Sequence, residues 1–386
     1  MKQFAITISL ILAGIVTSGQ NLDDFDFSTD STLEVVTWNI ETFPKNGLAT
    51  VDYVEDIITA IDADILAFQE ITDTYLFENA VSGLDGYEAY FPEENHMGLA
   101  YAWKTGTVDI TEIYRIYPGD NYSHPFPRRP LVMEFSYKGT PLIVVNNHFK
   151  CCGDNVIEPE DPWDEETRRL DASELIKTYI DENWPQKHVM VVGDLNDILT
   201  EDVEDNVFRI YFDDLDNYRF ADWDIANGSS SHWSYPSWPS HLDHILITNE
   251  LFDEMDEGIA ATQTLEIDDY LEGGWNEYEN NVSDHRPVAV RFQPDEGVGI
   301  SPISDSQTKL TIAPNPAKKQ VTIQSPEHTS EATVIIYNSQ GEKIVKWKIK
   351  NGVLHWNTTD IAPGIYIVKF ISENRTIASG KVIVKP

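Results

Sequence analysis

The chain has 386 residues and a formal net charge of −38, with 65 Asp and Glu against 27 Lys and Arg. This length allows one large domain and a small one, and the charge excludes simple electrostatic attraction of a polyanion as the basis of any activity. The two cysteines, Cys151 and Cys152, are adjacent, which excludes an ordinary disulfide scaffold; we expect two small, partly buried thiols, with a strained bridge or a soft-metal site as alternatives.

Residues 1–19 have the pattern of a signal peptide. Lys2 precedes an apolar run from Phe4 to Val16, and small residues follow up to Gly19, where cleavage is expected. The run is too short and too promptly terminated for a membrane-spanning helix, and no later segment is apolar enough to be one. We therefore expect a secreted protein, either extracellular or at the cell surface.

Residues 20–293 are predicted to form one α+β domain. Strand-like apolar runs occur at residues 33–40, 63–71, 99–110, 131–137, 141–149, 189–196, 242–248 and 287–292. Apolar residues at helical spacing occur at 51–61 and 172–179. Many strands without strict alternation with helices predict two packed sheets with helices outside.

Polar side chains that can bind a metal ion or move a proton follow several of these strands. Side chains alternate along the first strand, so Asn39 and Glu41 share one face. Glu70 ends the second run, and Asp194 and Asn196 follow the buried run at 189–192. Further candidates at strand ends are His148, Asp243, Asp284 and His285. Carboxylates and amides at a sheet rim suit Mg²⁺, although each residue alone is equally typical of a turn or a hydrogen-bonded surface.

Six short motifs occur together over residues 33–292: "TWNIE", "FQE", "NNHFK", "GDLND", "HLDHI" and "SDHRP". With these motifs in this order, the chain resembles the endonuclease/exonuclease/phosphatase superfamily. The resemblance implies a four-layered α/β/β/α sandwich with its site where the strand ends of two sheets meet. It also implies a metal-dependent phosphoric ester hydrolase.

The resemblance assigns a role to each candidate near the metal. The implied ligands of a divalent ion, Mg²⁺ or Mn²⁺ with Ca²⁺ as a further option, are Asn39, Glu41, Glu70 and Asp284. Asp194 would orient or deprotonate the attacking water, and Asn196 would position the water or the phosphate. Asn39 is also implied in substrate binding.

The remaining implied roles concern the phosphate and the leaving group. His285, oriented by Asp243, would bind phosphoryl oxygens or protonate the leaving group. His148 would bind phosphate, and Arg128 in "FPRRP" matches an Arg-x-Pro position from which relatives contact phosphate. The chain departs from deoxyribonuclease-like members in one respect, because "HMGLAYAWK" offers no glutamate to support His148.

A second domain is predicted after a linker at residues 294–307, which is rich in Pro, Gly and Ser. Residues 308–386 are predicted to form a small all-β immunoglobulin-like sandwich of about seven strands. The charge changes here, since residues 301–386 hold 11 Lys and Arg against 6 Asp and Glu. Through "IAPNP", Gly341, "IAPGIYIVKF" and "GKVIVKP" the domain resembles the type IX secretion sorting domain of Bacteroidetes, which implies that secretion machinery as a partner. A carbohydrate-binding or adhesive sandwich is the alternative.

Three functions are compatible with these patterns. The first is a secreted, monomeric nuclease that hydrolyses extracellular DNA or RNA. The second is a phosphodiesterase or phosphatase that acts on a phospholipid, as a sphingomyelinase does, or on a small phosphate ester. The third is a non-catalytic surface-binding protein, which has little need of so many ionisable groups at strand ends. The aromatic segment 231–240 could stack on a base or pack on itself.

Overall fold

The computed structural model describes residues 21–92, 98–294, 310–324, 331–338, 343–350, 352–359, 361–372 and 375–385. The predicted signal peptide and residues 295–307 of the predicted linker lie outside these described residues. The chain divides into two compact units, residues 1–299 and 300–386, while the domain boundaries expected from the sequence stay a prediction. Among the described helices, none is both long and apolar enough to cross a membrane.

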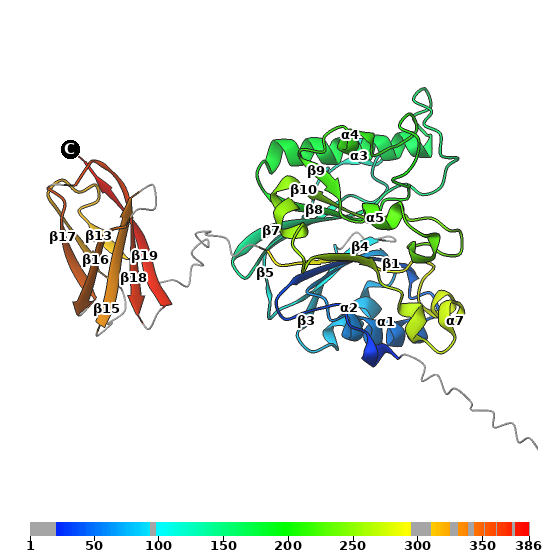
Figure 1. Ribbon diagram of the computed structural model, residues 1–386, viewed down its shortest axis with the longest axis horizontal. Coiled ribbons are helices and arrows are strands. Elements are labelled where there is room, and N and C mark those ends of the chain that lie inside the picture. The colour runs from blue at the N-terminus through cyan, green and yellow to red at the C-terminus, as the bar shows by residue number, and fades with distance from the viewer. Residues whose placement is uncertain are drawn as a thin grey trace, which may run out of the picture. The chain divides into compact units, whose positions relative to one another are not determined.

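Within the described part of the first unit, the strands form two six-stranded mixed sheets (Figure 1). The first sheet has the order β11 (Ala261–Thr264), β12 (Val288–Phe292), β1 (Leu33–Phe43), β2 (Ile65–Ile71), β4 (Gly98–Lys104) and β3 (Tyr87–Tyr90). The second has the order β5 (Val108–Arg115), β6 (Leu131–Tyr137), β7 (Thr140–His148), β8 (His188–Asp194), β10 (Asp243–Thr248) and β9 (Tyr218–Phe220). In each sheet the central pair, β1 with β2 and β7 with β8, is parallel.

Helices cover the outer face of each sheet. The first sheet packs against α1 (Leu48–Ile61), α2 (Thr74–Ser82) and α7 (Gly274–Asn281). The second packs against α3 (Glu165–Asn183), α4 (Arg209–Phe212) and α5 (Trp223–Ala226). Shorter elements are α6 (Phe252–Met255) and the 3₁₀ turns η1 (Leu22–Asp24), η2 (Asp120–Tyr122), η3 (Ser230–His232), η4 (Asn249–Leu251) and η5 (Ile267–Tyr270). The predicted four-layered sandwich is confirmed.

One apolar core lies between each sheet and its helices, and a third fills the space between the two sheets. The third core explains where the polar residues gather. Val35 of β1 points into this core, while Trp38 and Ile40 point to the helix side, as side-chain alternation predicts. Asn39 lies on the face of Val35 and is buried. The inward faces of the central strands are therefore apolar along most of their length and polar at one end.

One predicted strand is wrong. The run at 99–110 is not continuous, because β4 belongs to the first sheet and β5 to the second. The chain turns between them at Thr105, Gly106 and Thr107 and crosses from one sheet to the other. The interruption at residues 104–107 is short and contains two threonines, a residue type common in strands, so the pattern predicts one continuous strand. The short edge strands β3, β9 and β11 were not predicted either, because they present few apolar residues.

The described part of the second unit is all-β, as expected. One sheet contains β13 (Thr311–Ala313), β14 (Gln320–Gln324) and β17 (Val353–Asn357). The other has the order β16 (Lys343–Lys350), β15 (Glu331–Asn338), β18 (Gly364–Ser372) and β19 (Arg375–Val384). Val321, Trp356 and Val368 contribute to one core between them.

Candidate active site

The ends of β1 and β2 are irregular, and this irregularity aims their acidic side chains. The pairing register shifts between Asn39 and Phe43 on β1. Glu41, Thr42 and Glu70 have φ values of 25°, 50° and 64°, which are unfavourable for residues other than glycine. The backbone N–H of Thr42 donates to Glu70 Oε2 at 2.9 Å and joins the two irregular ends. Bulges and strained backbone of this kind commonly re-aim side chains at functional sites.

Strand β8 places Asp194 between two other candidates. Gly193 has φ of 146°, and a Cβ there would lie 2.0 Å from the carbonyl oxygen of Asn147 in β7. The glycine is thus required by the close approach of β7 and lies within β8. The register pairs Asp194 with His148 on one side and with Asp243 on the other.

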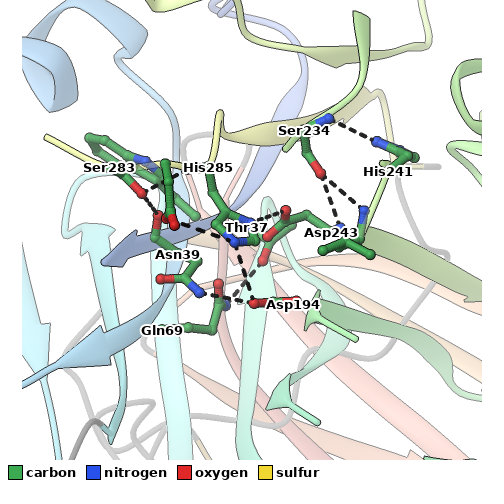
Figure 2. A network of polar contacts seen from close by, with 12 residues as sticks. Thr37, Asn39, Gln69, Asp194, Ser234, His241, Asp243, Ser283 and His285 are labelled. Carbon is green, nitrogen blue, oxygen red and sulfur yellow. Dashed lines mark hydrogen bonds and ion pairs between the residues drawn. The ribbon is translucent and has the colours of Figure 1, made fainter. Parts of the chain in front are cut away.

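The carboxylate of Asp194 is the centre of the polar cluster (Figure 2). Asn39 Nδ2 donates to Asp194 Oδ2 at 2.9 Å and so joins the two sheets. The same oxygen lies 3.5 Å from His148 Nε2 and 3.8 Å from His285 Nε2. The backbone N–H of Asn196 donates to Asp194 Oδ1 at 3.1 Å. Four predicted site residues therefore contact one buried carboxylate.

Burial dominates the charge state of Asp194. It raises the pKa of this carboxyl group to about 7, and the negative charges of Asp243 and Glu70 act in the same direction. The hydrogen bond from Asn39 and the positive charge of His285 oppose the increase. A carboxylate with this pKa can accept a proton near neutral pH.

His285 is held as a cation. Its Nδ1 lies 2.7 Å from Asp243 Oδ2. Burial lowers the pKa of His285, but Asp243 and Asp194 outweigh this effect and raise it to about 10. Ser283 Oγ accepts the backbone N–H of His285 at 3.0 Å and donates to the carbonyl of Asn39 at 2.6 Å, which fixes the loop against β1.

His148 differs from His285 in its charge. It is buried, and burial lowers its pKa well below the usual range, with the positive charges of Arg128 and His285 adding to the effect. His148 is consequently neutral at pH 7. Its Nδ1 has no hydrogen-bond partner among the described residues, in keeping with the lack of a supporting glutamate in the sequence. Arg128 is partly buried in the segment before β6, and the structure describes no contact between its side chain and the cluster.

The remaining acidic candidates lie around Asn39, although Glu41, Glu70 and Asp284 do not bring three ligand atoms within 4.8 Å of one another. The backbone N–H of Asp284 donates to Glu41 Oε2 at 3.0 Å, and Asn39 accepts the N–H of Glu41 at 3.0 Å. Asn39 Nδ2 also lies 3.4 Å from Glu70 Oε1. Burial and the charge of Asp284 raise the pKa of Glu41, against the opposing effect of Lys45. Mutually repelling carboxylates beside an amide oxygen are a donor set that a hard cation such as Mg²⁺ would stabilise.

The sequence did not reveal the side chains that support this cluster. Gln69 Nε2 donates to Asn146 Oδ1 at 2.8 Å, which joins β2 to β7 across the sandwich. Asn146 precedes His148 by two residues and so shares its face, which is the one signal that could have identified it. Ser234 Oγ accepts the backbone N–H groups of Leu242 and Asp243, both at 3.2 Å.

A buried group of Asp222, His241 and His244 lies beside Asp243 but does not suit a metal ion. Its ligand atoms are close to one another. However, the backbone N–H of Ser234 donates to His241 Nδ1 at 3.2 Å, so the proton of that ring is on Nε2, the atom nearest Asp222. His244 donates from Nδ1 to Asp222 and from Nε2 to a backbone carbonyl. Both nitrogens that face Asp222 carry protons, and the group is a hydrogen-bonded support.

Family comparison agrees with this geometry. The model of the Endonuclease/Exonuclease/phosphatase family matches residues 36–285, which is more than half of the chain. The chain belongs to the endonuclease/exonuclease/phosphatase family. It is therefore a metal-dependent phosphoric ester hydrolase. A second model, the secretion system C-terminal sorting domain, matches residues 311–385 and indicates secretion or export to the cell surface.

Solved structures of this family share the fold. The crystal structure of D. rerio TDP2 complexed with single strand DNA product has a TM-score of 0.51 and 13% identity, over 68% of this chain and 99% of that one. An AP endonuclease from Archaeoglobus fulgidus has a TM-score of 0.49 and 13% identity, over 67% of this chain and 99% of that one. No curated protein sequence matches the chain.

Proposed function

We propose that the protein is an exported, monomeric nuclease that hydrolyses phosphodiester bonds of extracellular DNA or RNA. The observation that carries the proposal is the convergence of Asp194, His148, His285 and Asn39 on one buried point between the two sheets. A neutral and a charged imidazole beside a carboxylate with a pKa of about 7 can bind a phosphate and move protons around it.

Asp194 is the group that would orient and deprotonate the attacking water. Its pKa near neutrality makes it an effective proton acceptor at physiological pH. Asn39 fixes the carboxylate through Oδ2, leaving limited freedom for it to turn. Asn196 is expected to position the water or a phosphate oxygen from the loop that follows β8.

His285 is the group that would stabilise negative charge on the phosphoryl oxygens or protonate the leaving oxygen. Asp243 orients the ring through Nδ1, which leaves Nε2 facing the cluster. His148 and Arg128 would bind the phosphate from the opposite side, where Arg128 supplies the positive charge and His148 a neutral donor.

Glu70, Asn39, Glu41 and Asp284 would hold Mg²⁺ or Mn²⁺, with Ca²⁺ as an alternative. When bound, such an ion neutralises phosphate charge and stabilises the departing oxygen. The protein groups then have to orient the substrate and move protons. Because Asn39 contacts both Glu41 and Asp194, it would also couple the metal side of the site to the water side.

The aromatic loop 231–240 supports a nucleic-acid substrate. Tyr235 packs against the ring of His285 with centroids 4.8 Å apart, whereas Trp238 on the same loop is 78% exposed. One aromatic side chain of the loop, Tyr235, thus packs against the site, and another, Trp238, is exposed to solvent. An exposed indole next to a phosphate site can stack on an unpaired base.

The test is cleavage of plasmid DNA, single-stranded DNA and RNA by the full chain with Mg²⁺ or Mn²⁺, with a chelator as control. Cleavage should require the metal and should be abolished in Asp194→Ala and His285→Ala variants that keep the wild-type circular dichroism spectrum. No cleavage of any nucleic acid with any of these metals would remove the proposal. Unchanged activity in both variants would instead show that the site assignment is wrong.

A phosphodiester lipid or small phosphate ester is the second candidate. The exposed Trp238 is equally compatible with it, because an indole also inserts at a lipid interface. Release of phosphocholine from sphingomyelin vesicles, or of inorganic phosphate from small esters, with nucleic acids left intact would establish this alternative. Absence of every hydrolytic activity in the folded, metal-loaded protein would leave the non-catalytic surface-binding function.

Export is proposed to use the signal peptide at residues 1–19 and the type IX machinery that reads the sorting domain. The mature chain should begin at residue 20. N-terminal sequencing of protein recovered from the culture medium tests the first point, and retention in the periplasm after deletion of residues 308–386 tests the second. A protein exported normally without its C-terminal domain would contradict the role of the sorting domain.

A further inference from the structure

The turn that follows the His148 strand carries a feature that phosphodiester hydrolysis does not use. Cys151 and Cys152 are free and both exposed, so the expectation of partly buried thiols is wrong. Their sulfur atoms are 2.8 Å apart, with the S–H of Cys152 directed at Cys151. Two exposed thiols held against each other on a protein surface require an explanation.

The buried Arg169 holds the backbone of Cys152, and the partly exposed Lys150 holds that of Cys151. Arg169 is 1% exposed, and its Nη1 donates to the carbonyls of Lys150 at 2.8 Å and of Cys152 at 2.7 Å. The carbonyl of Cys151 accepts from Lys150 Nζ at 2.8 Å. Each carbonyl of this stretch is therefore bound, and the proximity of the sulfurs does not depend on the side-chain rotamers alone.

The next residue continues this restraint. Gly153 has φ of 109°, and a Cβ there would lie 2.1 Å from Glu166 Oε1. The same carboxylate oxygen lies 3.1 Å from Arg169, which also donates to Asp197 at 2.7 Å. Arg169 is thus fixed by two acidic residues while it fixes the turn.

The backbone of the turn is already suited to an unusual covalent bond. Adjacent Cα atoms are about 3.8 Å apart, closer than the roughly 4.4 to 6.8 Å of ordinary disulfides, so a bridge between neighbours needs a distorted backbone. Cys152 has φ of 74°, in the left-handed region that residues other than glycine rarely adopt. The reduced protein therefore already has an unusual conformation here, and formation of the bridge requires less rearrangement.

The route of the protein supplies the oxidising conditions. The sorting domain indicates export, and disulfides form and persist outside the cytoplasm. An exported chain with two exposed thiols would otherwise form mixed disulfides or covalent dimers. We propose that Cys151 and Cys152 form a reversible vicinal disulfide, made by exchange with a dithiol oxidase or a low-molecular-weight disulfide.

The exchange is balanced in two steps. The sulfur of Cys151 attacks the oxidant's disulfide bond and releases one reduced thiol, leaving a mixed disulfide on Cys151. The Cys152 thiol then loses its proton and attacks the Cys151 sulfur, which releases the second reduced thiol. The hydrogen bond to Cys151 raises the pKa of the Cys152 thiol, so Cys152 keeps its proton during the first step. The two cysteines lose two protons and two electrons, and the oxidant gains them.

The test uses the full chain, reduced and then incubated with a glutathione redox buffer under metal-free conditions. Intact mass spectrometry should show a species that lacks two hydrogen atoms, carries no glutathione and resists alkylation until a phosphine is added. The Cys151→Ser and Cys152→Ser variants should each keep one glutathione instead. A wild-type protein that accumulates glutathione adducts, or that is still alkylated at both thiols in excess oxidised glutathione, would overturn the proposal.

Two further measurements test whether the folded turn promotes the bridge, or whether the adjacency of the two cysteines in the sequence is sufficient. The equilibrium constant for bridge formation should be at least about tenfold larger in the native protein than in urea, because Arg169 holds the turn only when the chain is folded. Equal constants would contradict the role of the turn. Protein recovered from culture medium, with its thiols alkylated at once, should contain the Cys151–Cys152 bridge. A reduced pair of cysteines that retains zinc or copper in native mass spectrometry would contradict the proposal. None of these readouts depends on hydrolase activity.

Discussion

Replacing Asp243 by Asn should convert His285 from a permanent cation into a ring that titrates near neutral pH. The two side chains are joined by a contact of 2.7 Å, and Asp243 is fully buried. An asparagine oxygen can still accept the Nδ1 proton, so the substitution removes charge and keeps most of the geometry. Asp194 and the adjacent Asp284 then oppose the effect of burial, and we expect the pKa of His285 to fall from about 10 to about 8.

The kinetic consequence depends on pH. If the protonated ring binds the phosphate or protonates the leaving oxygen, the wild-type rate should be maintained up to about pH 9 and be halved at about pH 10, where half of the His285 rings have lost the proton. In Asp243→Asn the alkaline limb should move down by about two pH units, so kcat should fall about twofold at about pH 8 and about tenfold at about pH 9, in proportion to the protonated fraction of the ring. Part of the lost activity should return as the pH is lowered.

The groups that face this ring must be considered in the assay. They are Asp243 on β10, Asp194 on β8, the adjacent Asp284, His148 on β7 and Tyr235, whose ring is tilted against that of His285. The ring titration should therefore also be measured by NMR in chelated protein. The exposed Asp253→Asn is the control with the same change in net charge and should leave both readouts unchanged. An alkaline limb that does not move in Asp243→Asn would refute the reasoning.

Three further outcomes follow from the structure. Ser234→Ala should lower kcat by about ten- to a hundredfold with little change in KM, because two backbone N–H groups next to Asp243 lose their acceptor, whereas Ser234→Thr should retain most activity. Burial raises the pKa of Glu34 from 4.5 to about 7. Between these two pH values the folded protein keeps a proton on Glu34 that the unfolded chain has released. The contribution of Glu34 to the free energy of unfolding therefore decreases as the pH rises from 4.5 to about 7. Urea unfolding should consequently show Glu34→Gln gaining about 1 to 3 kcal/mol relative to wild type between about pH 5 and about pH 8, and a pH-independent difference would contradict this. Finally, KM for DNA should fall severalfold when salt is raised from about 20 to about 200 mM, because the acidic domain repels the substrate; a rise in KM would show that a basic surface guides binding.

The sequence was sufficient to predict much of this architecture because local patterns encode it. Apolar runs that end on polar residues marked β1, β2, β7 and β8, and alternation placed Asn39 and Glu41 on one face of the first strand. The four-layered arrangement followed from the mixture of strands and helices together with the motif order. Each of these features depends on residues that are neighbours along the chain.

Features that depend on contacts between distant strands could not be predicted. Asp194 lies between His148 and Asp243 because β8 pairs with β7 and β10 in a particular register, which no local pattern specifies. The same limit applies to Gly193, since its glycine is needed for the approach of another strand. Ser234 looked like an ordinary loop serine, although it holds the segment that carries Asp243.

The turn at Cys151 and Cys152 also depends on contacts with residues that are distant in the sequence. The sequence indicated two adjacent thiols, but their exposure and their restraint depend on Arg169, which lies more than one helical turn into α3. The side chain of Arg169 reaches back to the turn and also to Asp197 after β8. A buried arginine with four such contacts could not be distinguished from a surface residue of an amphipathic helix by sequence spacing alone.

The most direct test of the central claim is the initial rate of DNA hydrolysis as a function of free Mg²⁺ for the wild type and for Glu70→Gln. The isosteric amide keeps the shape of Glu70 but removes a charge from the proposed metal ligands. The wild-type rate should saturate with Mg²⁺, vanish on chelation and return when Mg²⁺ is restored, and the variant should need far more Mg²⁺ and remain slower at saturation. Hydrolysis that persists in the chelator, or an unchanged Mg²⁺ dependence in the variant, would contradict the claim that these strand ends hold a cation against a phosphodiester.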